Sequence, residues 1–246
     1  DTATGAKPGQ TVAGDAPRRS PCAGGHPQLW PLASSPGSPS SRTHSRNRIV
    51  PVGMVRISQC ALHVLHADQI QGFFEVPVDH LYSSALFIKD IEAMKLDNLC
   101  IASPDMGGAK RAHAYGSKLG AEVVICYKQR KKANQIDKMT VIGDVEGMNV
   151  ILVDDMVDTG GTLVKAAEML KEKGAKSVRA YCTHGVLSGP AYDRIGGSAL
   201  EELVITDTIP QTKENPKVRV ISVADMFANV MKNVHHHQSI SGHFIM

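Results

Sequence analysis

The sequence contains no long apolar run and no closely spaced pair of cysteines. A membrane-spanning helix needs roughly 18 consecutive apolar residues, and no segment of the 246 residues approaches that length. The five cysteines are scattered without a CxxC pair. Three of them, Cys100, Cys126 and Cys182, lie in apolar, strand-like runs, so we predict buried thiols and a reducing, cytoplasmic compartment.

A strong excess of charge of one sign is missing as well. The chain has 27 Lys and Arg against 24 Asp and Glu, a formal net charge of +3. This balance gives no electrostatic argument for a nucleic acid or a membrane surface as a partner. The N-terminus also lacks the charged-then-apolar order of a signal peptide. We therefore expect neither nucleic-acid nor membrane binding.

Branched apolar residues are scarce in residues 1–48, which are rich in Pro, Gly, Ser, Ala and Arg. Residues 34–42 (SSPGSPSSR) are of low complexity. Such a segment buries too little apolar surface to offset its chain entropy. We predict that residues 1–48 are disordered or are not a native product, as in a truncated or frame-shifted reading frame.

The most informative stretch that is present is VILVDDMVDTGGT, residues 150–162. Its four leading apolar residues predict a strand at 150–153 that is buried on both faces of a parallel sheet. The loop that follows lies at the carboxyl end of the strand, where open α/β sheets bind ligands. Gly160 and Gly161 can take positive φ and let backbone N–H groups approach an anion. Thr159 and Thr162 add hydroxyl donors, so the turn is typical of a phosphate-binding site.

An amphipathic helix is predicted directly after this turn. Leu163, Ala167 and Leu170 share one face, and the pattern ends at Gly174, which suits a helix C-cap. The N-terminus of such a helix directs free amide groups and the positive end of its dipole toward the turn.

The three carboxylates of the stretch have a different role. Asp154, Asp155 and Asp158 repel a phosphate, but they can accept hydrogen bonds from sugar hydroxyls or bind Mg2+ through water. Together with the donors at the other end of the loop, they predict a pentose that carries a 5-phosphate. The alternative is an acidic turn in which Asp158 or Thr159 simply caps the helix.

Residues 150–162 resemble the phosphoribosyl-binding loop of type I phosphoribosyltransferases and of ribose-phosphate pyrophosphokinases. Three further segments are similar to the pyrophosphokinases and not to the transferases: residues 66–74 (HADQIQGFF), 103–111 (SPDMGGAKR) and 127–134 (YKQRKKAN). The resemblance covers residues 65–246.

The resemblance implies an α/β fold, with a parallel sheet of the type I phosphoribosyltransferase kind flanked by helices, and an incomplete N-terminal half-domain. Three parts are expected along the chain. Residues 1–48 form the low-complexity segment, 49–88 a remnant of the N-terminal half-domain, and 89–246 the phosphoribosyltransferase-like domain with the ribose 5-phosphate loop.

The resemblance also implies diphosphoryl transfer from Mg-ATP to ribose 5-phosphate, giving PRPP and AMP. Asp158, Thr159, Gly160, Gly161 and Thr162 would then hold the 5-phosphate. Asp154 and Asp155 would orient the ribose hydroxyls.

Metal and catalytic roles are implied for four further residues. His66 and Asp105 would hold Mg2+, although Val64 stands where the family has a supporting Asp, and Asp105 could instead be a helix N-cap. Lys128 and Arg130 lie in a cationic run after a predicted strand at 122–127, and would be the catalytic pair of a flap that closes over Mg-ATP.

The family's aromatic-rich ATP loop is not found in the first third of this chain. Two alternatives therefore stay open: a catalytically deficient relative that binds ribose 5-phosphate only, and a phosphoribosyltransferase that consumes PRPP. Family enzymes assemble as homo-oligomers. We expect self-association here to be impaired, with exposed sheet edges and apolar surface.

Overall fold

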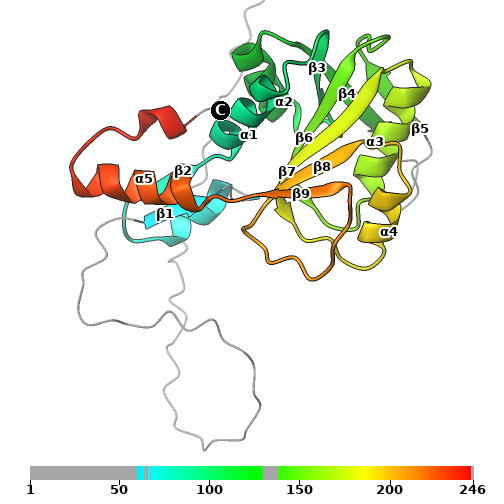
Figure 1. Ribbon diagram of the computed structural model, residues 1–246. Coiled ribbons are helices and arrows are strands. Elements are labelled where there is room, and N and C mark those ends of the chain that lie inside the picture. Colours follow the sequence, from blue (N-terminus) through cyan, green and yellow to red (C-terminus); the bar gives the residue numbers. More distant parts are fainter. Residues whose placement is uncertain (1–59, 64–65, 67, 130–137, 245–246) are drawn as a thin grey trace, which may run out of the picture. The chain divides into compact units, whose positions relative to one another are not determined.

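A computed structural model of the chain describes residues 60–63, 66, 68–129 and 138–244, which lie in a compact unit running from Gly53 to Met246 (Figure 1). Its centre is a seven-stranded sheet. The strands are β3 (Leu99–Ser103), β4 (Glu122–Gln129), β5 (Lys138–Ile142), β6 (Asn149–Val157), β7 (Ser177–Gly185), β8 (Glu202–Thr206) and β9 (Val218–Ile221). They lie in the order β5-β4-β3-β6-β7-β8-β9, with β5 antiparallel to β4 and all other neighbours parallel.

Helices cover both faces of this sheet (Figure 1). They are α1 (Ser84–Ala93), α2 (Ala109–Leu119), α3 (Gly161–Glu172) and α4 (Ala191–Gly196). Along β6, Val150 and Leu152 pack in one apolar cluster with residues of α3 and α4, whereas Ile151 and Val153 pack with residues of α1 and α2. This explains the unbroken apolar run, because a strand covered on both faces has no polar side.

The order of the strands creates a switch point between β3 and β6. From β3 the chain passes through α2 to β4 on one side, and β6 later pairs with the other side of β3, with Leu99 opposite Asn149. Ligands of open α/β sheets bind at such a point, beyond the carboxyl ends of the strands. The segments that leave β3 and β6 there are the ones that contain Asp105 and the predicted phosphate-binding turn.

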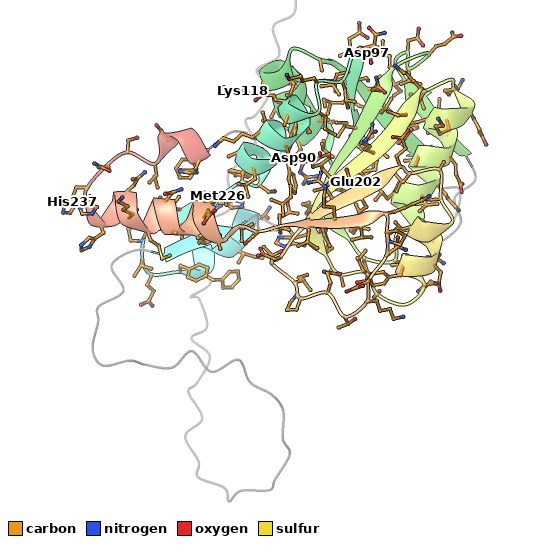
Figure 2. The ribbon with its side chains drawn as sticks, viewed as in Figure 1. Asp90, Asp97, Lys118, Glu202, Met226 and His237 are labelled. Carbon is orange, nitrogen blue, oxygen red and sulfur yellow. The ribbon has the colours of Figure 1, made fainter. Side chains whose placement is uncertain are left out.

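A second, two-stranded parallel sheet pairs β1 (Cys60–His63) with β2 (Val78–Leu81). The 3-10 helix η1 (Asp68–Phe73) connects the two strands, while α5 (Ala224–His235) and a second 3-10 helix, η2 (Ser241–His243), come near the end of the chain. Leu81 packs with Met226 and Val230 of α5 in a separate small core. Met226 lies near the start of α5, and His237 follows its end (Figure 2).

The strand predicted before the phosphate-binding turn is present in the structure, but its end differs from the predicted one. The strand expected at 150–153 extends through Val157, because β6 continues its parallel pairing with β7 as far as Val157 opposite Gly185. Asp154 and Asp155 therefore lie in the strand and not in the loop after it. The fold class predicted from the sequence is confirmed, whereas the boundaries at 48 and 88 stay predictions.

Two local predictions, the glycine at the end of α3 and the buried cysteines, are confirmed. Gly174 follows α3 with φ of 90°, as C-terminal glycines do. Cys100, Cys126 and Cys182 are buried, free thiols. Within the described residues, no helix is both long and apolar enough to span a bilayer.

Candidate functional site

The turn between β6 and α3 presents an uncapped helix N-terminus. Gly160 adopts the left-handed conformation with φ 72°, and α3 begins at Gly161 without a side-chain cap or an acidic residue in its first turn. The alternative that Asp158 or Thr159 caps α3 is therefore wrong. The amides of Gly160 and Gly161 donate no hydrogen bond to any residue that the structure describes. Such a terminus is suited to an anion.

The close packing behind Gly160 fixes its position. A Cβ on Gly160 would lie 3.6 Å from Ile195 Cγ1 and 3.9 Å from the Cα of Ala191, both in α4. Gly161, in contrast, is helical and does not need a positive φ. Gly160 thus supplies the left-handed conformation of the turn, and Gly161 is the first residue of α3.

Asp158 is held by the segment that leaves β7. Its carboxylate accepts a hydrogen bond from the Ser188 hydroxyl, and its carbonyl accepts one from the Ser188 amide at 3.1 Å. Thr159 is exposed and Thr162 is half-buried. The five residues predicted to hold a phosphate therefore form one continuous turn, tied at Asp158 to the next strand's loop.

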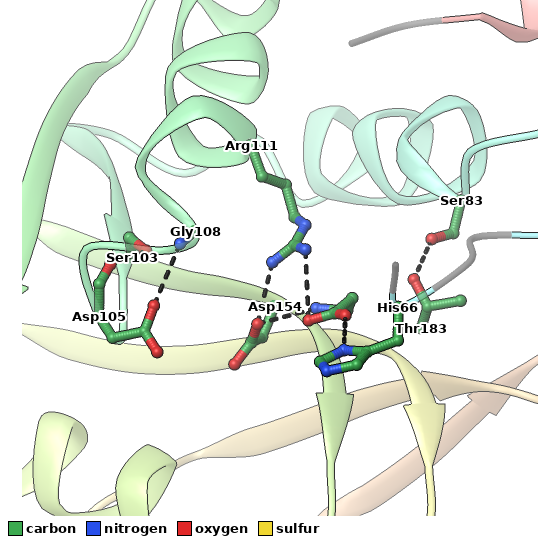
Figure 3. Close-up of polar contacts among 9 residues, drawn as sticks. His66, Ser83, Ser103, Asp105, Gly108, Arg111, Asp154 and Thr183 are labelled. Carbon is green, nitrogen blue, oxygen red and sulfur yellow. Dashed lines mark hydrogen bonds and ion pairs between the residues drawn. The ribbon is translucent and has the colours of Figure 1, made fainter. Parts of the chain in front are cut away.

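Arg111 is the direct partner of the two acidic residues in β6. From α2 it places Nη1 2.9 Å from Asp154 Oδ1 and Nη2 3.2 Å from Asp155 Oδ1. Figure 3 shows the guanidinium reaching down toward the strand from the helix. The side chains of Asp154 and Asp155 are 25% and 11% exposed, so the pair is shielded but open at its edge.

His66 contacts the same pair from the other side. Its Nδ1 donates to Asp155 Oδ2 at 2.6 Å, and its side chain is 68% exposed. Because a carboxylate can only accept, Nδ1 carries a proton, and Nε2 is the ring nitrogen left to bind a metal. A carboxylate that orients a histidine in this way is the usual outer partner of a metal-binding imidazole.

The two carboxylates titrate differently. Burial and the neighbouring Asp155 carboxyl raise the pKa of Asp154 to about 7, against the lowering effect of the Arg111 charge. Burial also opposes charge on Asp155, but hydrogen bonds from Asp154 and His66, with the Arg111 charge, outweigh it and lower the pKa of Asp155. Near neutral pH the pair therefore carries between one and two negative charges, one of which Arg111 offsets.

Asp105 is part of the turn that follows β3. Its Oδ1 accepts a hydrogen bond from the Gly108 amide at 3.1 Å, and its carbonyl accepts one from the Ser103 hydroxyl at 2.6 Å (Figure 3). The hydrogen bond from Gly108 closes the turn, whereas the N-cap of α2 is Gly108, so the alternative that Asp105 is the N-cap of the helix is wrong. The Asp105 side chain is exposed, and Oδ2 accepts no hydrogen bond from a described residue, which leaves that oxygen for a ligand.

The donor atoms fit Mg2+ in part. No group of three or more His, Cys, Asp or Glu side chains within the described residues could hold a metal, so His66 and Asp105 do not form a complete protein cage. Mg2+ normally takes only one or two carboxylates and completes its shell with water and substrate phosphates. The free oxygen of Asp105 suits that chemistry, whereas the His66 nitrogen is a poorer ligand for a hard cation.

Only one residue of the predicted catalytic pair, Lys128, lies within the described residues. Lys128 lies in β4, next to the end of the strand, and its side chain falls outside what the structure describes. Arg130 lies outside the described residues altogether. Their catalytic roles stay predictions.

Three residues that contact the candidate site were not predicted from the sequence. Arg111 contacts the acidic pair, whereas Ser188 and Arg194 contact the turn. Arg194 donates to the Thr159 carbonyl at 3.1 Å. Arg111 lies within the segment 103–111 that carries the resemblance, in the first turn of α2 at the switch point. An arginine there could have been matched to the acidic pair of β6 by charge. For the other two the sequence offers no comparable signal.

The structure also has a hollow of about 710 Å³, lined by the segment after β8 and by β9. Its lining residues are Gln211, Thr212, Lys213, Glu214, Asn215, Pro216, Val218 and Val220. None of the predicted site residues is among them, so the candidate site is the edge of the sheet and not this hollow.

An open, mostly parallel α/β sheet with an uncapped glycine turn and an acidic pair at its switch point defines a class of nucleotide- and sugar-phosphate-binding folds. Comparison with known proteins narrows the class. The family described as the phosphoribosyl synthetase-associated domain matches residues 123–245. The chain is 49% identical over 212 residues to the ribose-phosphate pyrophosphokinase of Campylobacter jejuni, covering 86% of this chain and 68% of that protein.

Two further similarities agree. The ribose-phosphate pyrophosphokinase of Porphyromonas gingivalis is 53% identical over 178 residues, which cover 72% of this chain and 57% of that protein. The crystal structure of phosphoribosylpyrophosphate synthetase from Mycobacterium smegmatis matches with a TM-score of 0.66 and 36% identity, over 73% of this chain and 59% of that chain. The chain belongs to the ribose-phosphate pyrophosphokinase family, and it spans 57% to 68% of the length of these relatives.

Proposed function

We propose that the chain acts as a ribose-phosphate diphosphokinase. The 1-hydroxyl of ribose 5-phosphate attacks the β-phosphorus of ATP, the bond between the α- and β-phosphates breaks, and AMP leaves as PRPP forms. The observation that carries this proposal is the uncapped N-terminus of α3, which begins behind the left-handed Gly160 at the switch point of the sheet. Membership of the pyrophosphokinase family supports the same reaction.

In the proposed complex the turn from Asp158 to Thr162 holds the 5-phosphate through backbone amides and threonine hydroxyls. The acidic pair Asp154 and Asp155 accepts hydrogen bonds from the ribose hydroxyls, because carboxylate oxygens are strong acceptors. Arg111 keeps both carboxylates in place before the sugar arrives, which lowers the cost of ordering the site.

Mg2+ would be held by Asp105, with His66 as an additional ligand oriented by Asp155. When bound with ATP, the ion neutralises charge on the phosphates. Lys128 and Arg130 are proposed to stabilise the negative charge that develops on the transferred group. The protein's own contribution would be positioning and charge neutralisation, as in other phosphoryl transfers.

A second candidate function is binding of ribose 5-phosphate without turnover. It is kept because the family's aromatic-rich ATP loop is not recognisable in this sequence, and because Val64 stands where the family has a supporting Asp. In this case the turn after β6 would keep its role, while the ATP-dependent steps would be absent.

One assay separates the two functions. The chain is incubated with Mg-ATP and ribose 5-phosphate, and AMP is quantified by chromatography, with ribose in place of ribose 5-phosphate as the control. AMP release that depends on the 5-phosphate supports the kinase. Binding of ribose 5-phosphate by calorimetry without AMP release supports the second candidate, and absence of both contradicts each of them.

A pair of glycine variants tests the assigned turn. Gly160 and Gly147 have similar left-handed φ values of 72° and 68°, and they lie at opposite ends of β6. Replacing either by Ala costs about 1 kcal/mol of stability through strain. Gly160→Ala is expected to weaken ribose 5-phosphate binding, whereas Gly147→Ala leaves it unchanged. Equal affinities in the two variants would remove the turn from the proposed site.

We further propose a cytoplasmic location and weak self-association. The three buried, free thiols support a reducing compartment. Exposed apolar side chains on η1, above all Phe73 with 89% exposure, support an additional contact surface. Sedimentation velocity over a range of concentrations tests the association, and one stable, monodisperse hexamer would contradict its proposed weakness.

A further inference from the structure

Arg194 is a cation at the back of the phosphate-binding turn with no role in the proposed reaction. Its Nη1 donates to the Thr159 carbonyl at 3.1 Å. The same nitrogen lies 3.5 Å from where a Cβ on Gly161 would be, so the guanidinium lies against the first residue of α3. Among the described residues, no carboxylate pairs with Arg194.

The bond to Thr159 controls the direction of a single amide group. The carbonyl of Thr159 and the N–H of Gly160 belong to one trans peptide, in which the two groups point in opposite directions. Arg194 occupies the carbonyl side, so the Gly160 N–H points away from it. That N–H has no hydrogen-bond acceptor among the described residues and is available to an incoming anion.

The helix that carries Arg194 is firmly anchored. Ile195 is fully buried and packs against Gly160. The Tyr192 hydroxyl donates to Gln211 Oε1 at 2.7 Å, and Asn215 Nδ2 donates to the Tyr192 carbonyl at 3.0 Å. These contacts hold the six-residue helix in place and keep the arginine beside the turn, as a positioning group requires.

We propose that Arg194 is a positioning residue for the 5-phosphate. Through the Thr159 carbonyl it orients the Gly160 amide toward the anion, and it thereby contributes to the preference for phosphorylated over unphosphorylated sugars. The inference rests on the proposed function of the turn. Arg194 does not touch the phosphate, since the peptide group lies between them; its effect passes through the backbone, and its positive charge adds to the helix dipole.

The test compares three variants by isothermal titration calorimetry with ribose 5-phosphate. Arg194→Gln is expected to weaken binding about tenfold, the effect of one charge-assisted hydrogen bond. Arg194→Lys is expected to recover most of the affinity, because an ammonium group can donate to the same carbonyl. Lys173→Gln is the matched control, because it removes the same charge at the other end of α3.

Each outcome supports or overturns a distinct statement. If Arg194→Gln lowers the melting temperature but leaves the dissociation constant unchanged, the residue is structural only and the inference is wrong. If Lys173→Gln weakens binding as much as Arg194→Gln, net charge and not the Thr159 contact is responsible. Failure of the wild-type protein to bind ribose 5-phosphate removes the proposed function itself and, with it, this inference. Binding by the wild type with unchanged affinity in Arg194→Gln removes the inference alone.

Discussion

Replacing Arg111 by Met should destabilise the protein in a pH-dependent way. The substitution keeps an unbranched side chain of similar length but removes the guanidinium that contacts Asp154 at 2.9 Å and Asp155 at 3.2 Å. Two neighbouring carboxylates, only 25% and 11% exposed, then face each other without a cation. Removing one partner of a buried ion pair costs more than the pair itself contributes, because a desolvated charge stays behind.

The magnitude depends on protonation. Hydrogen bonds to charged groups contribute about 1.5 to 3 kcal/mol when buried, and the partial exposure of the two carboxylates places the loss at about 2 kcal/mol at pH 8.5, where Asp154 is ionised. The folded-state pKa of Asp154 is raised to about 7, so its contribution to stability falls as pH rises from about 4 through 7. At pH 5.5 Asp154 holds its proton, only Asp155 remains charged, and we expect a loss of about 1 kcal/mol.

Urea unfolding of the wild type and Arg111→Met at both pH values measures this difference. Arg179→Met is the control, because Arg179 pairs with Glu201, a 44% exposed carboxylate at the opposite end of the sheet. We expect the control to lose at most about 1 kcal/mol at either pH. An equal loss for Arg111→Met at pH 5.5 and 8.5, or a smaller loss than in the control, would refute the reasoning.

Three further predictions concern other parts of the molecule. Asp90 has a pKa lowered below its usual value, since hydrogen bonds from Arg219 and Tyr181 outweigh its burial; its stabilising effect is fully present above about pH 4 and is lost as the pH falls through the lowered pKa, so Asp90→Asn should be destabilised at pH 7, and its difference from the wild type in urea unfolding should shrink progressively as the pH falls below about 4 (Figure 2 labels Asp90). In preparations that release AMP, Lys128→Gln should lower kcat about 100-fold without changing the dissociation constant for ribose 5-phosphate, and a purely raised KM would contradict its catalytic role. Phe73→Ser should reduce concentration-dependent association in sedimentation velocity, because this ring is 89% exposed; unchanged association would exclude η1 as the contact surface.

Much of the fold was predictable because its signals are local. The predicted strand at 122–127 and the predicted helix that ends at Gly174 correspond to β4 and α3, since apolar patterns and C-terminal glycines mark such elements in short windows. The lengthening of β6 to Val157 was not predictable, because it depends on pairing with β7, which lies further along the chain. The separate β1–β2 sheet and its contact with α5 likewise depend on distant residues.

The candidate site also has a part that is recognisable from local sequence and a part that depends on distant residues. The turn at Asp158–Thr162 was recognisable from glycines and hydroxyls in one continuous stretch. Arg111 joins Asp154 across 43 residues, and His66 joins Asp155 across 89, so neither contact leaves a trace in local spacing. The acidic pair was therefore predicted as a free sugar-binding group, while in the folded protein it is held by two cationic or polar side chains from other elements.

The central claim is that the turn between β6 and α3 holds the 5-phosphate of ribose 5-phosphate. Backbone amide NMR of the 15N-labelled protein, titrated with ribose 5-phosphate and separately with ribose, tests it most directly. We predict that the amide signals of Gly160 and Gly161 shift strongly with ribose 5-phosphate and not with ribose. Shifts confined to the hollow lined by residues 211–220, or identical shifts with both sugars, would contradict the account.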